Sequence, residues 1–375
     1  MSLVLTRIQN IRANSNLDKF EYRPSRYGAL NAFMVQSEDP TGILTEELKQ
    51  KARTSIGNTL ETPVIYYDAA DITIGSTRTL TIADSENTSK MVQITFATYA
   101  WGFTIAPAMY MNNEIGIQKD FEAKMMKYIY AFAKKLDEAA LAQLAASKTQ
   151  ILKNKLLYDF SSNAINAKWT ERENVFGDLE VMMGANDFYG QLHIVGDPGV
   201  ESIMRKLQQH GLYNDVNKQN EFGTKIVHLT NSIAADGGKY AQGYAVNAGS
   251  LGMLTRFERD CLLGTVSGDG HEWGIATLPL LNMPVGTYFY DSVDDCRAIA
   301  GAATADMART RKEHYGFAVD VAFLTAYNSS LSTLASPVLA FNVSNKDAVY
   351  AKPVVVMNTE DNPVNTKEAS AGVGG

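Results

Sequence analysis

The sequence predicts an α+β fold in which strands and helices occur in separate blocks along the chain. Alternating apolar residues mark strands on both sides of a long helical stretch, and one uninterrupted apolar stripe marks that helix over 117–147. A mixed segment of short strands and helices follows the helix. The length of 375 residues suggests about two or three domains, or one elaborate domain.

The composition excludes several classes of protein. Hydrophobic residues make up 45% and charged residues 20% of the chain, which excludes a disordered chain, a collagen-like chain and a disulfide scaffold. The net charge of −7 argues against a dedicated DNA-binding domain, because such domains are basic overall. Cys261 and Cys296 form no Cys-x-x-Cys pair. We expect both to be small buried residues of a protein in a reducing compartment. The sequence leaves open whether a disulfide joins them.

Residues 1–60 are predicted to form an arm with too few apolar residues for a core of its own. The arm must therefore lie on another surface, unless it is a solvated tail. A helix is expected over 45–53, where acidic residues come first and basic residues last, as the helix dipole favours. Residues 1–36 carry five basic and two acidic residues and so a net charge of +3. The basic residues of the arm are Arg7, Arg12, Lys19, Arg23 and Arg26.

Residues 61–106 are predicted to form an extended β-hairpin. Apolar residues alternate with polar ones over 79–82 and over 92–96, and the small polar segment 83–90 between them is expected as the tip. A two-stranded ribbon is marginal alone in water and needs a partner surface. After Phe96 the apolar residues change from even to odd positions. This change predicts either a bulge or a strand that leaves one environment for another.

The strongest helical pattern runs from Ile117 to Ser147, inside the segment 107–165. Apolar residues recur there at steps of three and four, and no Pro or Gly interrupts them. At 1.5 Å per residue the helix would be about 46 Å long, so we expect a spine that lies across a sheet. The residues expected to pack are Phe121, Met125, Tyr128 and Phe132.

Residues 166–300 are predicted to form a separate α/β unit. A short strand ends at the sequence GDPG, Pro198 opens a helix, and Gly211 is placed to end it. The segment 278–290 contains two prolines and is expected as a loop or an edge strand. Residues 293–311 are expected as an alanine-rich helix with Asp294 and Asp295 at its N-terminus.

Residues 301–345 are predicted to return to the body of the protein. Alternating apolar residues over 315–323 and a run over 337–343 indicate two strands. Residues 346–375 are polar and are expected as a tail. Two stretches without charges, 91–113 and 321–345, are long enough to span a bilayer, but their polar residues favour buried strands and no membrane contact. Nor is the N-terminus expected as a signal peptide, because two arginines break its apolar run.

A search for catalytic motifs gives one weak candidate. The Gly237-Gly238-Lys239 sequence lacks the following Ser or Thr of a phosphate-binding loop. Asp269, His271 and Glu272 lie in one glycine-rich loop and could form a metal or acid–base cluster, although a polar loop is the commoner outcome. The five histidines are far apart in sequence, and their convergence in space stays open. We therefore expect no catalytic residue, no metal, no cofactor and no enzymatic activity.

The order of these features resembles the major capsid protein of tailed bacteriophages, which has the Hong Kong 97 phage-type fold. The segments that carry the resemblance are 103–130, 193–207 and 313–343. In the terms of that family, the arm is the N-arm, the hairpin is the E-loop, 107–165 is the peripheral domain with its spine helix, and 166–300 is the axial domain. The segment 301–345 would then be the returning part of the peripheral domain, and 346–375 the C-terminal tail.

The resemblance implies a coat protein that self-assembles as pentamers and hexamers into an icosahedral head. The head would enclose double-stranded DNA without sequence-specific contacts, form in the host cytoplasm and become part of the virion. Portal, scaffold and head-decoration proteins are the other implied partners, and the scaffold would be a separate protein or absent. The hairpin residues assigned to contacts between subunits are Leu80, Ile82, Asn87, Lys90, Val92 and Ile94. Lys90 is the lysine in the region of the family's crosslink, and no partner asparagine follows from the spacing.

Two other interpretations stay open. An encapsulin-like shell resembles the same fold but encloses enzymes instead of DNA. A hydrolase with its site in the loop 268–274 belongs to a different class altogether. Particle size and DNA content separate the two shells, and activity in a monomer would favour the hydrolase.

Overall fold

The computed structural model describes residues 3–13, 26–55, 57–66, 88–110, 116–148, 158–186, 188–211, 225–264, 270–296, 308–326 and 336–346. The statements below concern these residues.

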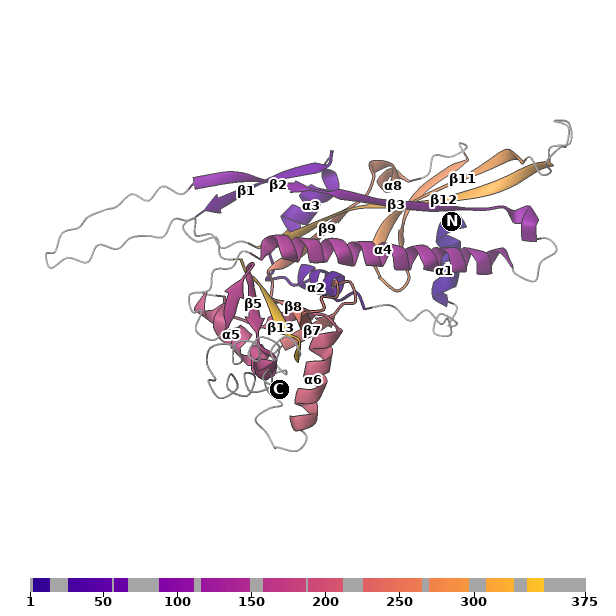
Figure 1. The fold of residues 1–375 in the computed structure, drawn as a ribbon. Helices are drawn as coiled ribbons and strands as arrows, with labels where there is room; N and C mark the ends of the chain where they lie inside the picture. The colour runs from indigo at the N-terminus through magenta and orange to yellow at the C-terminus, as the bar shows by residue number, and fades with distance from the viewer. Residues whose placement is uncertain are drawn as a thin grey trace, which may run out of the picture.

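A two-stranded ribbon and two larger sheets make up the β-structure (Figure 1). The ribbon consists of β1 (Thr59–Tyr66) and β2 (Thr88–Thr95), which are antiparallel. The five-stranded sheet has the order β10-β11-β12-β3, and β9 also pairs with β12. Its strands, all antiparallel, are β3 (Ala97–Ile105), β9 (Leu251–Arg256), β10 (His271–Thr277), β11 (Pro284–Cys296) and β12 (Ala308–Thr325).

The six-stranded sheet has the order β4-β5-β13-β8-β6-β7. It is mixed, because β13 runs parallel to β5 and β6 runs parallel to β7. Its strands are β4 (Asp159–Ser161), β5 (Ala164–Ala167), β6 (Leu192–Gly196), β7 (Lys225–Leu229), β8 (Lys239–Asn247) and β13 (Val338–Ser344).

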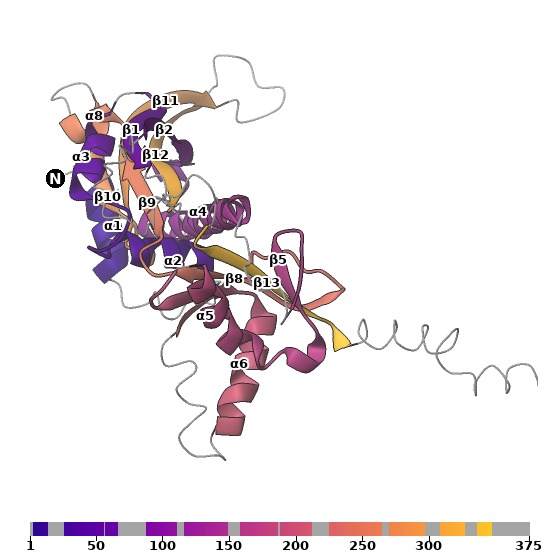
Figure 2. The same cartoon turned by 90° about the vertical axis from the view of Figure 1, so that its left-hand side faces the viewer.

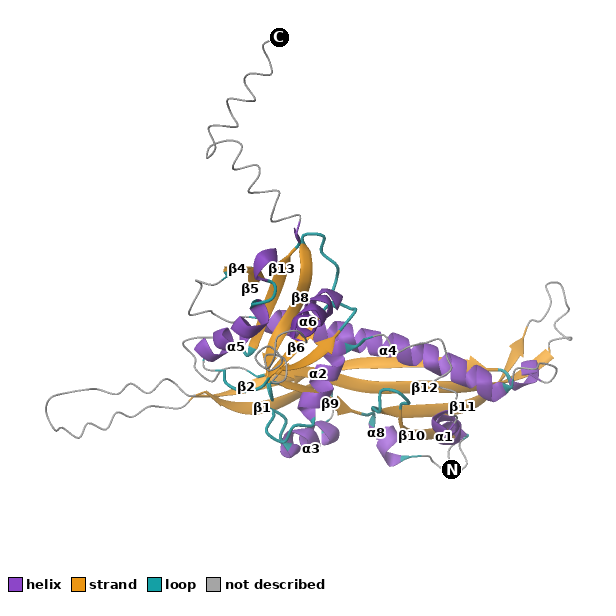
Figure 3. Ribbon diagram, turned by 90° about the horizontal axis from the view of Figure 1, so that it is seen from below, coloured by secondary structure: helices purple, strands orange, loops and turns teal. Residues whose placement is uncertain are grey.

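The helices cover both sheets and the joint between them (Figure 2). The long helix α4 lies along the five-stranded sheet, and α5 and α6 lie beside the six-stranded sheet (Figure 3). The bounds are α1 (Leu3–Ala13), α2 (Gly28–Ser37), α3 (Glu46–Thr54), α4 (Ile117–Ser147), α5 (Val175–Ala185), α6 (Pro198–Gly211) and α8 (Arg259–Leu263). Among the described residues there are also two short 3-10 helices, η2 (Pro107–Tyr110) and η3 (Trp169–Glu171). Among these helices, we find none with the combined length and apolar character needed to cross a membrane.

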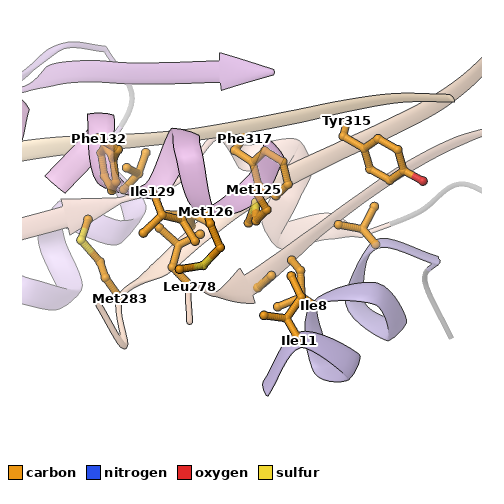
Figure 4. Packing of buried hydrophobic residues seen from close by; sticks show 14 of the residues in the cluster. Ile8, Ile11, Met125, Met126, Ile129, Phe132, Leu278, Met283, Tyr315 and Phe317 are labelled. Carbon is orange, nitrogen blue, oxygen red and sulfur yellow. The ribbon is translucent and has the colours of Figure 1, made fainter. Parts of the chain in front are cut away.

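The long helix confirms the spine that the sequence predicts. It runs unbroken over Ile117–Ser147, and Phe121, Met125 and Phe132 are buried against the five-stranded sheet. Figure 4 shows Met125 and Phe132 in this packing. Tyr128 is half-buried and its ring stacks on Phe103 of β3 at 5.8 Å between centroids. The stripe of apolar residues therefore faces the sheet, as its spacing requires.

The change of phase at Phe96 marks a strand that passes between two sheets. Before it, β2 pairs with β1 in the ribbon; after it, β3 pairs with β12 in the five-stranded sheet. Phe96 itself is buried between the two strands. The second of the two alternatives that the pattern offers is therefore the correct one.

The prediction of a helix over 293–311 is wrong at both ends of the segment, where the structure has strands. Residues up to Cys296 belong to β11, and residues from Ala308 belong to β12, with Asp291 opposite Glu313 in the register. Asp294 and Asp295 therefore lie on a strand and do not begin a helix. The alanine-rich part, 297–307, lies outside the described residues. Long-range pairing of two long strands overrides the local helical preference here.

The segment 278–290 matches the prediction only in its first part, because 278–283 is a loop and the residues from Pro284 form a central strand, neither a loop nor an edge strand. Strand β11 begins at Pro284 and lies between β10 and β12, in the interior of the sheet. Pro284 is tolerated because it is the first residue of the strand, where a missing N–H removes little of the pairing.

The boundaries predicted for the α/β unit do not match the sheets. Strands β9, β10 and β11, all within 166–300, belong to the five-stranded sheet with the spine. Strand β13, from the segment 301–345, belongs to the six-stranded sheet instead. Spacing along a sequence predicts that strands exist, but sheet membership depends on packing between distant segments.

Candidate intersubunit surface

The ribbon of β1 and β2 projects from the body of the protein (Figures 1 and 3). Its register places Leu60 opposite Ile94, Thr62 opposite Val92 and Val64 opposite Lys90. Within the described part of the chain, each strand pairs only with the other. Both outer edges therefore present backbone groups that can pair with another chain.

The root of the ribbon is fixed to the body by a small core. Leu60, Ile94 and Phe96 are each 5% exposed or less and pack with residues of α3, β9 and β12. The Phe96 N–H donates to the Asn58 carbonyl oxygen at 2.9 Å. These contacts set the direction in which the ribbon leaves the sheet.

Arg256 of β9 adds a polar contact to the same root. Its guanidinium lies 4.4 Å from the centre of the Phe96 ring and donates to Asp320 Oδ2 at 2.9 Å. It also donates to Ser55 Oγ at 3.2 Å. Arg256 is 6% exposed, so a buried charge is paired on one side and stacked on an aromatic ring on the other.

Beyond the root, one face of the described ribbon is exposed to solvent, while Thr62 and Val92 on the other face are half-buried. Met91 is 56% exposed, and Glu61, Pro63 and Gln93 are exposed as well. Among the described residues, no layer of the chain covers that face. Such a surface becomes stable when another molecule covers it.

The predicted hairpin is described in part. The strand 88–95 pairs with 59–66, and the expected strand 79–82 lies outside the described residues. Thr88, Ser89 and Lys90 lie on a strand, although the sequence places them in the tip. Alternation identifies a strand but not its partner, because many polar and apolar pairs fit the same period.

The six residues assigned to the intersubunit hairpin separate into three groups. Ile94 is buried in the subunit's own core, which excludes it from an exposed contact, and Val92 is half-buried. Lys90 lies on β2, and its side chain lies outside the described atoms. Leu80, Ile82 and Asn87 lie outside the described residues.

The N-terminal arm lies on the body, as its low apolar content requires. Val4, Ile8 and Ile11 of α1 are buried against α4 and the five-stranded sheet. Figure 4 shows Ile8 and Ile11. The expected helix near residue 45 is also present, and the Thr45 hydroxyl caps α3 by accepting from the Leu48 N–H.

Two basic residues of the arm pair with acidic residues of the same chain. Arg7 lies 2.9 Å from Glu313, and its guanidinium lies 5.4 Å from the centre of the Tyr315 ring. Burial, together with the hydrogen bond that Tyr315 donates to Glu313, raises the pKa of the tyrosine. Arg26 pairs with Glu201 of α6. These arginines therefore neutralise acidic side chains of their own subunit.

The side chains of the other three basic residues of the arm lie outside the described part of the structure. Arg12 lies on α1, but its side chain lies outside the described atoms. Lys19 and Arg23 lie outside the described residues.

No family model matches the chain, and no curated protein gives a significant match. Solved structures of phages are similar to it. One, of Mycobacterium phage Cain, is 12% identical and covers 88% of this chain and 97% of its own, with a TM-score of 0.49. The capsid of Ralstonia phage GP4 is 9% identical and covers 88% and 93%, with a TM-score of 0.47. The capsid structure of the Cyanophage P-SCSP1u is 11% identical and covers 78% and 85%, with a TM-score of 0.44.

The residues of the weak catalytic candidate have structural partners. His271 Nδ1 lies 2.6 Å from the Tyr288 hydroxyl, and Glu272 accepts a hydrogen bond from the Leu3 N–H at 3.2 Å. Asp269 lies outside the described residues. Across the described ranges, no three His, Cys, Asp or Glu side chains are grouped so that they could hold a metal ion.

Cys261 is buried in α8, as expected for a small core residue. Burial raises the pKa of its thiol, which makes it a poor nucleophile at neutral pH. The side chain of Cys296 lies outside the described atoms.

Proposed function

We propose that this chain is the major capsid protein of a tailed bacteriophage, and that it self-assembles into the icosahedral head around double-stranded DNA. One observation carries the proposal. The ribbon of β1 and β2 is held rigidly at its root by Leu60, Ile94 and Phe96, and its described outer part is left uncovered. A rigid, uncovered projection suits a protein whose fold is completed by its neighbours.

The arrangement of charge supports the same proposal. The chain carries a net charge of −7, and two arginines of the arm are neutralised within the subunit. A shell with this balance encloses DNA without binding it tightly, because the phosphate backbone is attracted only by unpaired cations. The DNA contact would be non-specific.

In this function the subunits would form pentamers and hexamers, and the ribbon of each would lie on the next. The remaining hairpin residues, Leu80, Asn87 and Lys90 among them, would contribute to that contact. Portal, scaffold and head-decoration proteins would be the other partners. Assembly would occur in the host cytoplasm, and the product would be part of the virion. The role is structural and needs no catalytic group.

Electron microscopy and light scattering of the full chain test the proposal. With scaffold and portal proteins supplied, we expect closed particles of uniform size that contain pentamers and hexamers. Nuclease-protected DNA in particles from infected cells would distinguish this head from a shell that encloses enzymes. Monomers or dimers alone under these conditions would contradict the proposal.

A further inference from the structure

Two histidines that are far apart in sequence meet in the interior of the protein. His193 lies on β6 and His228 on the neighbouring parallel strand β7. Their rings are stacked, with 5.3 Å between centroids and 10° between planes. The residues are 4% and 5% exposed, so the pair is almost completely removed from water.

A chain of hydrogen bonds runs from Asn31 through both rings. Asn31 Nδ2 lies 3.4 Å from His228 Nδ1, and His228 Nε2 lies 3.0 Å from His193 Nδ1. Because an amide nitrogen can only donate, His228 Nδ1 is the acceptor and its Nε2 carries the proton. His228 then donates to His193. Both rings are neutral in this arrangement.

Among the described residues, a further proton on either bonded nitrogen would face a donor. On His193 Nδ1 it would face the N–H of His228 in a buried contact, and on His228 Nδ1 it would face the amide nitrogen of Asn31, which is an exposed residue. The first replaces a buried hydrogen bond by two donors that face each other, which is strongly unfavourable. The second breaks the hydrogen bond between α2 and His228.

The pair lies where α2 joins the two sheets. Asn31 is on α2, whose Phe33 packs with Leu144 of α4 and Val195 of β6. At the start of the helix, Gly28 approaches Leu229 of β7 so closely that a Cβ would lie 2.5 Å from its carbonyl carbon.

The other end of α2 is bound to the five-stranded sheet. Gln36 Oε1 accepts from the Leu251 N–H at 3.0 Å, and Ser37 Oγ accepts from the Met253 N–H at 2.7 Å. Helix α2 therefore links the two sheets directly.

Few charged groups face the pair. Asp39, just after α2, is the carboxylate that acts on His193 and raises its pKa slightly against the larger lowering by burial. Arg26 lines the same cavity as His228, a space of about 520 Å³ between α2, α4 and β7.

The remaining charged groups nearby have other partners. Both carboxylate oxygens of Asp137 in α4 accept hydrogen bonds, from the Leu30 N–H and from the Thr230 hydroxyl. Lys225, at the start of β7, lies 3.7 Å from Glu180. None of these groups accepts a proton from either ring.

We propose that the His193–His228 pair is an acid-released latch between α2 and the six-stranded sheet. Protonation of the pair separates α2 from β6 and β7 and frees the six-stranded sheet to move relative to the five-stranded sheet. The latch follows from the local geometry and does not depend on the capsid function.

The direction of the pH effect follows from the histidine pKa values. Burial lowers the pKa of both rings, and that of His228 falls to about 4, with the charge of His193 as a second cause. With α2 packed on the six-stranded sheet (the closed joint), the two histidines thus bind fewer protons than they do when α2 is separated from it. In the separated state, histidine has its ordinary pKa of about 6.5. The closed joint is fully stable above about pH 6.5 and weakens as the pH falls toward 4.

Hydrogen exchange of the full chain, corrected for the intrinsic pH dependence of exchange, tests the latch. Between pH 7 and pH 4.5 we expect the protection of amides in 28–37 and 225–230 to fall at least about tenfold. Amides in the first half of α4 should keep their protection. An equal loss in that part of α4 would overturn the proposal, because acid would then unfold the whole chain.

Three variants complete the test. In a His193→Gln/His228→Gln double variant, the protection of both segments should be the same at the two pH values. Asn31→Asp, which keeps the shape of the side chain and offers a protonated His228 an acceptor, should reduce the loss of amide protection at pH 4.5.

His314→Gln is the control, because His314 lies in the other sheet, between the Thr104 and Ser292 hydroxyls. It should behave as the wild type. Constant protection in the wild type, or the wild-type loss in the double variant or in Asn31→Asp, would overturn the proposal.

Discussion

The Thr230 hydroxyl donates a hydrogen bond of 2.5 Å to Asp137 Oδ2, and both residues are completely buried. The second carboxylate oxygen of Asp137 accepts from the Leu30 N–H at 3.0 Å. One side chain of the spine helix thus holds the first turn of α2 and the residue that follows β7. A buried carboxylate with both oxygens occupied fixes the position of each donor, since neither has water as an alternative.

Replacing Asp137 with Ala should therefore lower the free energy of unfolding by about 2–4 kcal/mol, because two buried donors lose their acceptor. Denaturant unfolding of the unassembled subunit measures the change. Glu138→Ala is the matched control, one residue along the helix, where Glu138 pairs with Lys135 on the solvent side. The control should leave the unfolding midpoint unchanged. Equal effects of the two substitutions would show that the carboxylate does not hold the joint.

Phe132 provides a test of the apolar side of the same helix. It is 5% exposed, and its ring lies 4.5 Å from that of Trp101 and 5.9 Å from that of Tyr99. Phe132→Ala should destabilise the subunit by about 3–5 kcal/mol through lost burial and the cavity that remains. Thermal unfolding followed by circular dichroism gives the value. A loss no larger than that of Phe132→Leu would mean that the site collapses around the smaller side chain.

Gly199 is required by a close approach of backbone to backbone. A Cβ at this position of α6 would lie 2.0 Å from the Tyr240 carbonyl oxygen of β8. Gly199→Ala should force α6 away from the sheet and cost about 1–3 kcal/mol or more. Gly237→Ala is the control, since a Cβ at Gly237 meets no atom within 4 Å. Denaturant midpoints of the two variants should differ clearly, and similar midpoints would contradict the tight contact.

The elements that the sequence predicts well are those with a long and one-sided pattern. The spine was predictable because its apolar stripe persists over 31 residues on one face. Helix α2 was missed for the opposite reason. Its residues Ala29, Leu30, Ala32 and Phe33 are buried on several sides, between α4 and both sheets, so no polar face marks its period.

The candidate surface was predictable as a ribbon but not in detail. Alternation around Ile94 indicates a strand, but it cannot reveal that this side chain packs under α3 in the subunit's own core. Arg256 and Asp137 were also missed, because a single charged residue in a sequence carries no sign of its partner. A signal exists for Asp137: it follows Ala133 by four residues and precedes Ala140 by three, on the buried side of the helix.

The last prediction concerns the ribbon, where two residues of one strand should separate folding from assembly. Met91 and Ile94 both lie on β2, but Met91 is 56% exposed and Ile94 is 5% exposed. Met91→Asp removes no intrachain contact of the core, so the melting temperature of the unassembled subunit should stay unchanged. If neighbours cover the ribbon, the new charge would be desolvated in every subunit contact and should greatly reduce the yield of shells.

Ile94→Ala, unlike Met91→Asp, should destabilise the unassembled subunit, because it leaves a cavity among Leu60, Phe96 and Leu254. We expect its melting temperature to fall, in line with a loss of about 2–5 kcal/mol. Differential scanning calorimetry of subunits and sedimentation of assembled particles measure the two properties separately. Normal shells from Met91→Asp would mean that this part of the ribbon stays in solvent after assembly. A lower melting temperature for Met91→Asp would instead assign Met91 to the fold of the subunit, and the ribbon would lose its role as the surface that neighbours complete.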